Sequence, residues 1–176
     1  GLYASADRYC IGFLDLLARS GMTRAAIVYE NSAFHQSIQE GFRRWANIFG
    51  VDAVYSHAFP NQSPEFDTVI EDLKLRNLDA LIFSAYPPEG YAFLNTLQNK
   101  AYRPRNLFMP ILPIHPDFYQ KAGPMGEGVF APSNWEPIES IPFPGTKRFV
   151  TDFKRKTGHL PSYHATAAYA SCQLLQ

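Results

Sequence analysis

The chain has 176 residues, of which 46% are hydrophobic, and its 16 basic residues balance 16 acidic ones. This length and composition allow a substantial core, either in one large lobe or in one domain with an appendage. A balanced charge gives no general attraction for nucleic acid or anionic lipid, so we expect neither partner. Charged or turn residues interrupt every apolar run before the roughly 20 residues that a bilayer helix needs, so we expect no direct membrane insertion.

The first part of the chain predicts a helix, a strand and a second helix. Residues 4–19 carry apolar side chains in a mostly helical rhythm, and Gly21 follows as part of a stop signal. The apolar run at 25–29 suits a strand that is buried on both faces. We expect Ser32 to cap the next helix, in which apolar residues recur at intervals of three and four until Gly50 ends it.

The alternation of strand and helix then repeats. Further strands are expected at 51–57, 79–83 and 106–109, with helices that start within 61–64 and 87–90. Regular alternation of this kind predicts an α/β fold with a doubly wound parallel sheet and helices on both faces.

Beyond Pro110 the pattern changes. We expect a short helix at 116–121, a glycine-rich turn and a strand at 129–131. Prolines at 132, 137, 142 and 144 indicate an extended crossover rather than a regular element. Two helices, 146–157 and 162 to the end, complete the predicted order, and the basic residues of the first are expected to form a solvated face.

The loops that follow the predicted strands carry the functional information. In an open parallel sheet, ligands bind beyond the carboxyl ends of the strands. Asn31, Phe34, Ser84 and Tyr86 follow two of these strands, so we expect them to share one edge and to contact a small molecule. Either aromatic ring could instead belong to the core or its rim, and Asn31 and Ser84 could simply cap helices. Trp135, in the crossover, could line a cleft or pack over the sheet edge.

Nothing in the sequence predicts catalysis, a metal site or a cofactor. The five histidines lack the spacing of metal-ligand or nucleophile motifs. The one acid–base pairing to consider is His57 with Asp52 or Glu65. Cys10 and Cys172 lie in predicted helices and are expected to be buried apolar side chains, although a disulfide between them stays open.

Several segments together resemble a known family. They are AAIVYEN, EGFRRWANIFG, EFDTVIEDLKLRNLDALIFSAYPPEG, GVFAPSNWEP and FKRKTGHLPSYHATAAYAS, and in this order they are similar to type I periplasmic binding proteins. The similarity is strongest to the branched-chain amino acid branch, whose members deliver solutes to ATP-driven importers. It covers nearly the whole chain.

The resemblance implies two α/β lobes that close over a solute by a hinge motion. Residues 1–131 would form most of the second lobe, 132–145 the hinge connection, and 146–176 helices that belong to the other, mostly absent lobe. Both chain ends look cut. Residues 146–176 are therefore expected to expose apolar faces, to swap between chains or to pack atypically.

The resemblance also implies a binding site. Phe34 and Tyr86 match positions where relatives place aromatic residues. Relatives that bind amino acids place a carboxylate after the next strand, but Ile111 and Leu112 stand there in this chain, with Leu112 as a candidate contact. Because burying an ammonium group without a partner is costly, this departure favours an aromatic or aliphatic carboxylate over a branched-chain amino acid.

The expected function is that of a non-catalytic, extracytoplasmic or periplasmic solute-binding component that works with the membrane permease of an ABC importer. Two alternatives stay open from the residues. One is a ligand-sensing domain of a receptor or regulator with the same fold, and the other is a small α/β hydrolase.

Overall fold

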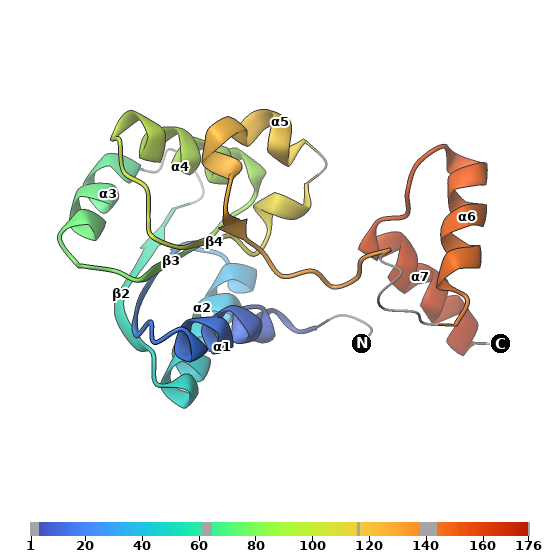
Figure 1. Ribbon diagram of the computed structural model, residues 1–176, viewed down its shortest axis with the longest axis horizontal. Helices are drawn as coiled ribbons and strands as arrows, with labels where there is room; N and C mark the ends of the chain where they lie inside the picture. Colours follow the sequence, from blue (N-terminus) through green and yellow to red (C-terminus); the bar gives the residue numbers. More distant parts are fainter. Residues whose placement is uncertain (1–3, 61–64, 116, 138–143, 176) are drawn as a thin grey trace. The chain divides into compact units, whose positions relative to one another are not determined.

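The computed structural model describes residues 4–60, 65–115, 117–137 and 144–175 (Figure 1). These residues divide into two compact units, one spanning Ser5–Pro132 and the other containing the residues from Ser133 onward. The predicted helix start within 61–64 lies outside the described residues. Within the described part, no helix is both long enough and apolar enough to cross a membrane.

The first unit contains a five-stranded sheet in which all neighbouring strands are parallel, as predicted. The strand order is β2-β1-β3-β4-β5. The central strands β1 and β3 are largely buried, whereas β2 lies at an edge and buries only its last residue, Phe59. The strands are β1 (Arg24–Glu30), β2 (Asp52–Phe59), β3 (Ala80–Ser84), β4 (Leu107–Phe108) and β5 (Val129–Phe130).

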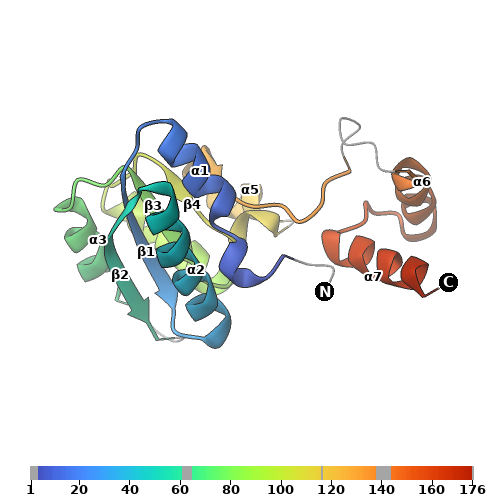
Figure 2. The same cartoon turned by 90° about the horizontal axis from the view of Figure 1, so that it is seen from below.

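Helices cover both faces of this sheet (Figures 1 and 2), which confirms the doubly wound arrangement. Helices α1 (Ile11–Arg19) and α2 (Ala33–Phe49) pack on one face. Helices α3 (Phe66–Lys74) and α4 (Pro87–Asn99) pack on the other, together with the short α5 (Phe118–Ala122).

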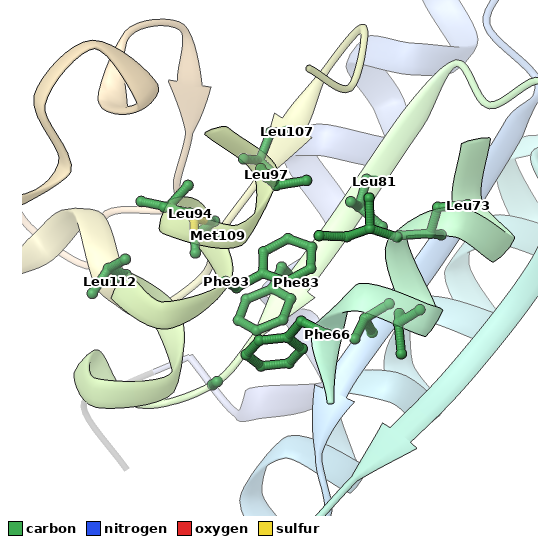
Figure 3. Packing of buried hydrophobic residues seen from close by; sticks show 14 of the residues in the cluster. Phe66, Leu73, Leu81, Phe83, Phe93, Leu94, Leu97, Leu107, Met109 and Leu112 are labelled. Carbon is green, nitrogen blue, oxygen red and sulfur yellow. The ribbon is translucent and has the colours of Figure 1, made fainter. Parts of the chain in front are cut away.

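The core under α3 and α4 is built around aromatic rings (Figure 3). Phe83 of β3 stacks on Phe93 of α4 with centroids 3.8 Å apart, and both side chains are almost fully buried. Phe66 meets both rings edge-on, at 5.5 and 5.2 Å. Such pairs add about 0.5–1.5 kcal/mol each beyond simple burial, so this cluster fixes how α3 and α4 sit on the sheet.

The predicted continuous helix at 4–19 is wrong, because the segment breaks into two pieces. A 3₁₀ turn, η1 (Ala6–Arg8), precedes α1. The indole nitrogen of Trp45 donates to the carbonyl oxygen of Asp7 at 3.1 Å. In a continuous α-helix that oxygen would accept from the amide of Ile11, so a tertiary hydrogen bond replaces a helical one.

The remaining short elements lie after α4. They are the 3₁₀ turns η2 (Leu112–Ile114) and η3 (Gly123–Gly126), which flank α5. Helix α2 ends as predicted, since Gly50 adopts a left-handed conformation at φ 70°. A side chain at that backbone angle would be strained.

The second unit contains α6 (Thr146–Thr157) and α7 (Tyr163–Leu174). No described residue of either helix is buried. The two helices meet through Phe149 and Tyr169, whose rings stack with centroids 4.4 Å apart. Exposed apolar side chains include Leu160, Tyr169, Leu174 and Leu175. These apolar side chains are therefore not buried within the unit itself, and the assignment of 146–176 to another lobe stays a prediction.

The two cysteines differ in environment. Cys10 is buried, as expected, and burial raises the pKa of its thiol to about 12. Cys172 is exposed, so the expectation of burial is wrong for this residue. The reason is that α7 has no buried face within its own unit. Both thiols are free.

Candidate functional site

Two central strands end side by side and bring the loop residues to one edge of the sheet. In the parallel pairing of β1 with β3, Tyr29 lies opposite Ser84. Asn31 follows directly after β1, Phe34 lies in the first turn of α2, and Tyr86 is the N-cap residue of α4. The carboxyl ends of these strands thus gather the predicted residues at one place.

Phe34 and Tyr86 form an aromatic pair at this edge. Their rings are nearly parallel, with an interplanar angle of 17° and centroids 6.3 Å apart. Tyr86 is 44% exposed and Phe34 is half-buried. Tyr9 supports Phe34 from the side with an edge-on contact at 6.1 Å. We call the Phe34–Tyr86 pair the aromatic rim.

A buried polar group lies next to the aromatic rim. The Nδ1 atom of His35 is 2.8 Å from the hydroxyl oxygen of Ser84, and both residues are fully buried. The Nε2 atom of His35 lies 3.7 Å from Oε2 of Glu30, which is also buried. The same Oε2 accepts a hydrogen bond from the backbone amide of Tyr86 at 3.3 Å. We call Glu30, His35 and Ser84 the polar triplet.

The protonation of this triplet follows from its burial. Removal from water lowers the pKa of His35 to about 4, so the imidazole is neutral at neutral pH. Two of its polar atoms, Oε1 of Glu30 and Nε2 of His35, have no hydrogen-bond partner within the described residues. Buried polar atoms without partners are uncommon in folded proteins.

The residue types of the polar triplet are those of a hydrolase triad, but its geometry does not suit nucleophilic catalysis. Ser84 and His35 are fully buried, so no substrate reaches the hydroxyl in this conformation. The separation of 3.7 Å between His35 and Glu30 exceeds hydrogen-bonding distance. The described residues also contain no cluster of three potential metal ligands.

The capping alternatives do not describe Asn31 and Ser84. The Oδ1 atom of Asn31 accepts from the side-chain Nε2 of Gln36 at 2.7 Å, and Ser84 pairs with His35. Ser32 occupies the N-cap position of α2, as predicted, but its side chain makes no capping hydrogen bond. The expectation of a Ser32 side-chain cap is therefore wrong, and its hydroxyl oxygen is buried without a partner among the described residues.

The other two predicted contacts lie in different surroundings. Leu112 is 1% exposed and packs below the first turn of α4, where a Cβ on Gly90 would be 3.0 Å from its side chain. Trp135 belongs to the second unit and meets Phe149 edge-on at 6.3 Å. It lines a pocket of about 210 Å³ together with Phe149 and Tyr169. Ligand contact by Leu112 or Trp135 stays a prediction.

The proposed acid–base pairing of His57 receives no support from the described residues. His57 lies within β2 and stacks on Tyr55, with centroids 6.1 Å apart and an interplanar angle of 3°. No hydrogen bond or ion pair joins it to Asp52 or Glu65 in the part of the chain that the structure describes.

Sequence reasoning missed Glu30 and His35. For His35 a signal was present, because it shares a helical face with Ile38 and Phe42, which are buried. For Glu30 the signal was a charged residue at the end of an otherwise apolar strand. Neither signal identifies a partner.

The family model for periplasmic binding proteins matches residues 2–176. The Leu/Ile/Val-binding protein homolog 7 of Brucella suis is 21% identical over 86% of this chain and 39% of its own length. The chain thus spans well under half the length of this relative.

Solved structures show the same fold. The leucine-, isoleucine-, valine-, threonine- and alanine-binding protein of Brucella ovis, in its closed conformation, superposes with a TM-score of 0.84 at 18% identity. That superposition covers 98% of this chain and 44% of the other. A solute-binding protein of an ABC transporter from Rhodopseudomonas palustris, in complex with 3,4-dihydroxybenzoic acid, gives 0.70 at 18% identity, with coverages of 97% and 47%. The chain belongs to the periplasmic binding protein family.

Proposed function

We propose that this protein is the periplasmic, non-catalytic solute-binding component of an ABC importer, and that it captures a small organic acid or amino-acid-like ligand by lobe closure. The observation that carries the proposal is the aromatic rim, which places Phe34 and Tyr86 at the carboxyl edge of a parallel sheet. Membership of the periplasmic binding protein family supports the binding role and the location.

The chemistry of the edge favours a ligand with a flat or branched apolar group. Ring faces offer apolar contact at small entropy cost, and the phenol of Tyr86 can orient a polar substituent. The Glu30 carboxylate, at the end of β1, is buried and is not available to a ligand, whereas Glu89 in the first turn of α4 is half-buried. Leu112 stands where amino-acid-binding relatives place a carboxylate for the ligand ammonium group, so an aromatic or aliphatic carboxylate is the preferred class.

Isothermal titration calorimetry of the full-length protein tests this proposal. The probes are benzoate, 3,4-dihydroxybenzoate and L-leucine, because the similar structures include binders of a hydroxylated aromatic acid and of aliphatic amino acids. We expect the aromatic acids to bind more tightly than leucine. Tight binding of leucine-like ligands alone would refute the ligand class, and turnover of a substrate would refute the non-catalytic role.

A variant pair connects binding to the aromatic rim. Tyr86→Ala removes one of the two rings and should weaken binding of the preferred probe by about tenfold, since ring contacts contribute about 0.5–1.5 kcal/mol beyond area burial. Tyr119→Ala is the control, because Tyr119 is also exposed, at 81%, but lies on α5. Equal losses of binding affinity in both variants would show that the aromatic rim does not contact the ligand.

A further inference from the structure

The aromatic rim is assembled from two separate elements. Phe34 belongs to α2 and Tyr86 to the start of α4, and 52 positions separate them in sequence. Their centroids are 6.3 Å apart, toward the long end of the separations found in aromatic pairs, so their mutual contact is weaker than that of the core pair Phe83–Phe93 at 3.8 Å. Contacts with neighbouring groups therefore contribute to their separation and their nearly parallel orientation.

His35 contacts both rings. Its imidazole meets Phe34 at 5.2 Å with an interplanar angle of 80°, and it meets Tyr86 at 4.8 Å with an angle of 73°. His35 is fully buried, whereas Tyr86 is 44% exposed. The buried imidazole therefore makes an edge-to-face contact with each ring of the aromatic rim.

The imidazole is itself anchored to the sheet. Ser84, the last residue of β3, holds Nδ1 at 2.8 Å. Glu30, the last residue of β1, binds the backbone amide of Tyr86 through Oε2. The ring of His35 and the main chain of Tyr86 are thus fixed to adjacent strands, which makes their relative position rigid.

The composition of the core sets this group apart. Among the described residues, Glu30, His35 and Ser84 are the buried polar or charged side chains, and all three lie at the carboxyl edge of β1 and β3. Buried polar groups generally cost stability relative to well-packed apolar ones of similar volume. Their concentration beside the rim is explained if they hold the rim in place.

We propose that His35 is a positioning residue for ligand capture, whose imidazole, anchored by Ser84, sets the spacing of Phe34 and Tyr86 and thereby the thickness of the ligand group that the rim accepts. This inference rests on the proposed function for its role in binding. The ring geometry that it describes is measurable without any ligand.

The test separates the ring of His35 from its hydrogen bond. In His35→Asn, an amide takes the place of Nδ1 and retains a partner for Ser84, but the ring contacts to Phe34 and Tyr86 are lost. Ser84→Ala keeps the ring and removes its anchor. His57→Asn is the matched control, because the same substitution then falls on a histidine of β2 that does not contact the rim.

The first readout is the nuclear Overhauser effect between the ring protons of Phe34 and Tyr86 in full-length, selectively labelled protein. We expect it to be present in the wild type and in His57→Asn, and to fall at least threefold in His35→Asn. The second readout is the ratio of the dissociation constants for benzoate and L-leucine, which should change by about three- to tenfold in His35→Asn. Thermal unfolding verifies that each variant is folded.

The outcomes are distinguishable. An unchanged ring-to-ring effect and an affinity ratio within twofold of the wild type in His35→Asn would overturn the positioning role. If His35→Asn does not fold, the same two readouts are measured in Ser84→Ala. Both are expected to change less than in His35→Asn, and no change in either would overturn the positioning role. If the wild type binds neither probe while the ring geometry still depends on His35, the proposed ligand class fails and the positioning role stands.

Discussion

Gly41 in the middle of α2 should reverse the usual effect of replacing a helical glycine with alanine. In an ordinary helix interior, Gly→Ala stabilises by about 0.5–1 kcal/mol because glycine loses more backbone freedom on folding. A Cβ on Gly41, however, would overlap the backbone of Asp7 and lie 2.6 Å from its Cα atom. Because backbone atoms cannot turn aside as a flexible side chain does, η1 must move.

The expected magnitude follows from three contributions. Overpacking against fixed structure costs about 1–3 kcal/mol, and displacing η1 also weakens the hydrogen bond from Trp45 to Asp7, which contributes about 0.5–1.5 kcal/mol. The intrinsic gain offsets about 0.5–1 kcal/mol of this. We expect Gly41→Ala to lower the free energy of unfolding by about 1–3 kcal/mol.

The control is Gly12→Ala in α1, where an added Cβ would meet no atom within 4 Å. It should raise the free energy of unfolding by about 0.5–1 kcal/mol. Urea titration followed by Trp45 fluorescence measures both, in a Trp135→Phe background that silences the second unit, since the chain has 2 tryptophans. Equal stabilisation by both alanines would refute the close approach of η1 to α2.

Three further outcomes are expected. Burial lowers the folded-state pKa of His35 to about 4, below its unfolded value of about 6.5. The stability contributed by the neutral imidazole is therefore fully present above pH 6.5, and it is lost as the pH falls from 6.5 through 4. The loss of unfolding free energy attributable to His35 approaches about 3 kcal/mol, and the titratable groups that face its imidazole are the Glu30 carboxyl and the Tyr86 phenol. Chemical unfolding at a series of pH values should show this loss as the difference between wild type and His35→Asn. The same dependence of unfolding free energy on pH in both proteins would contradict it. A thiol reagent at pH 8 should modify Cys172 at once and Cys10 only in denaturant, because burial raises the pKa of Cys10 to about 12; rapid loss of two thiols from folded protein would refute this. Phe93→Ala should lower the free energy of unfolding by about 3–5 kcal/mol, since it removes a fully buried ring from the aromatic core, and a urea titration that gave less than about 1 kcal/mol would contradict that packing.

The sequence predicted the architecture because the signals for it are local. The run Ala80–Ser84 is buried at every position, and the amphipathic pattern of α2 extends without interruption to Gly50. Local patterns of this kind specify which faces are buried and where helices end. They also placed Asn31, Phe34, Ser84 and Tyr86 at one edge, because parallel strands end on the same side.

The parts that were missed depend on distant partners. The break before α1 arises from Trp45, 38 positions away from Asp7, and no local pattern announces it. The pairing of His35 with Ser84 spans 49 positions. Helical periodicity predicts that His35 is buried, but it cannot say which group accepts or donates at Nδ1. Tertiary hydrogen bonds therefore limit what a single sequence reveals.

The polar triplet departs from the otherwise apolar interior at the edge where we propose that a ligand binds. An apolar residue in place of His35 could fill the same volume without burying an unpartnered nitrogen. Such local conflicts are expected at functional sites, where positioning outweighs stability. Glu30 accepts a hydrogen bond from the main chain of Tyr86, and His35 contacts both rings. These buried polar groups therefore lower stability but give the aromatic rim a defined geometry. A rim with defined spacing loses less conformational entropy when it closes on a ligand, and this favours tighter and more selective binding.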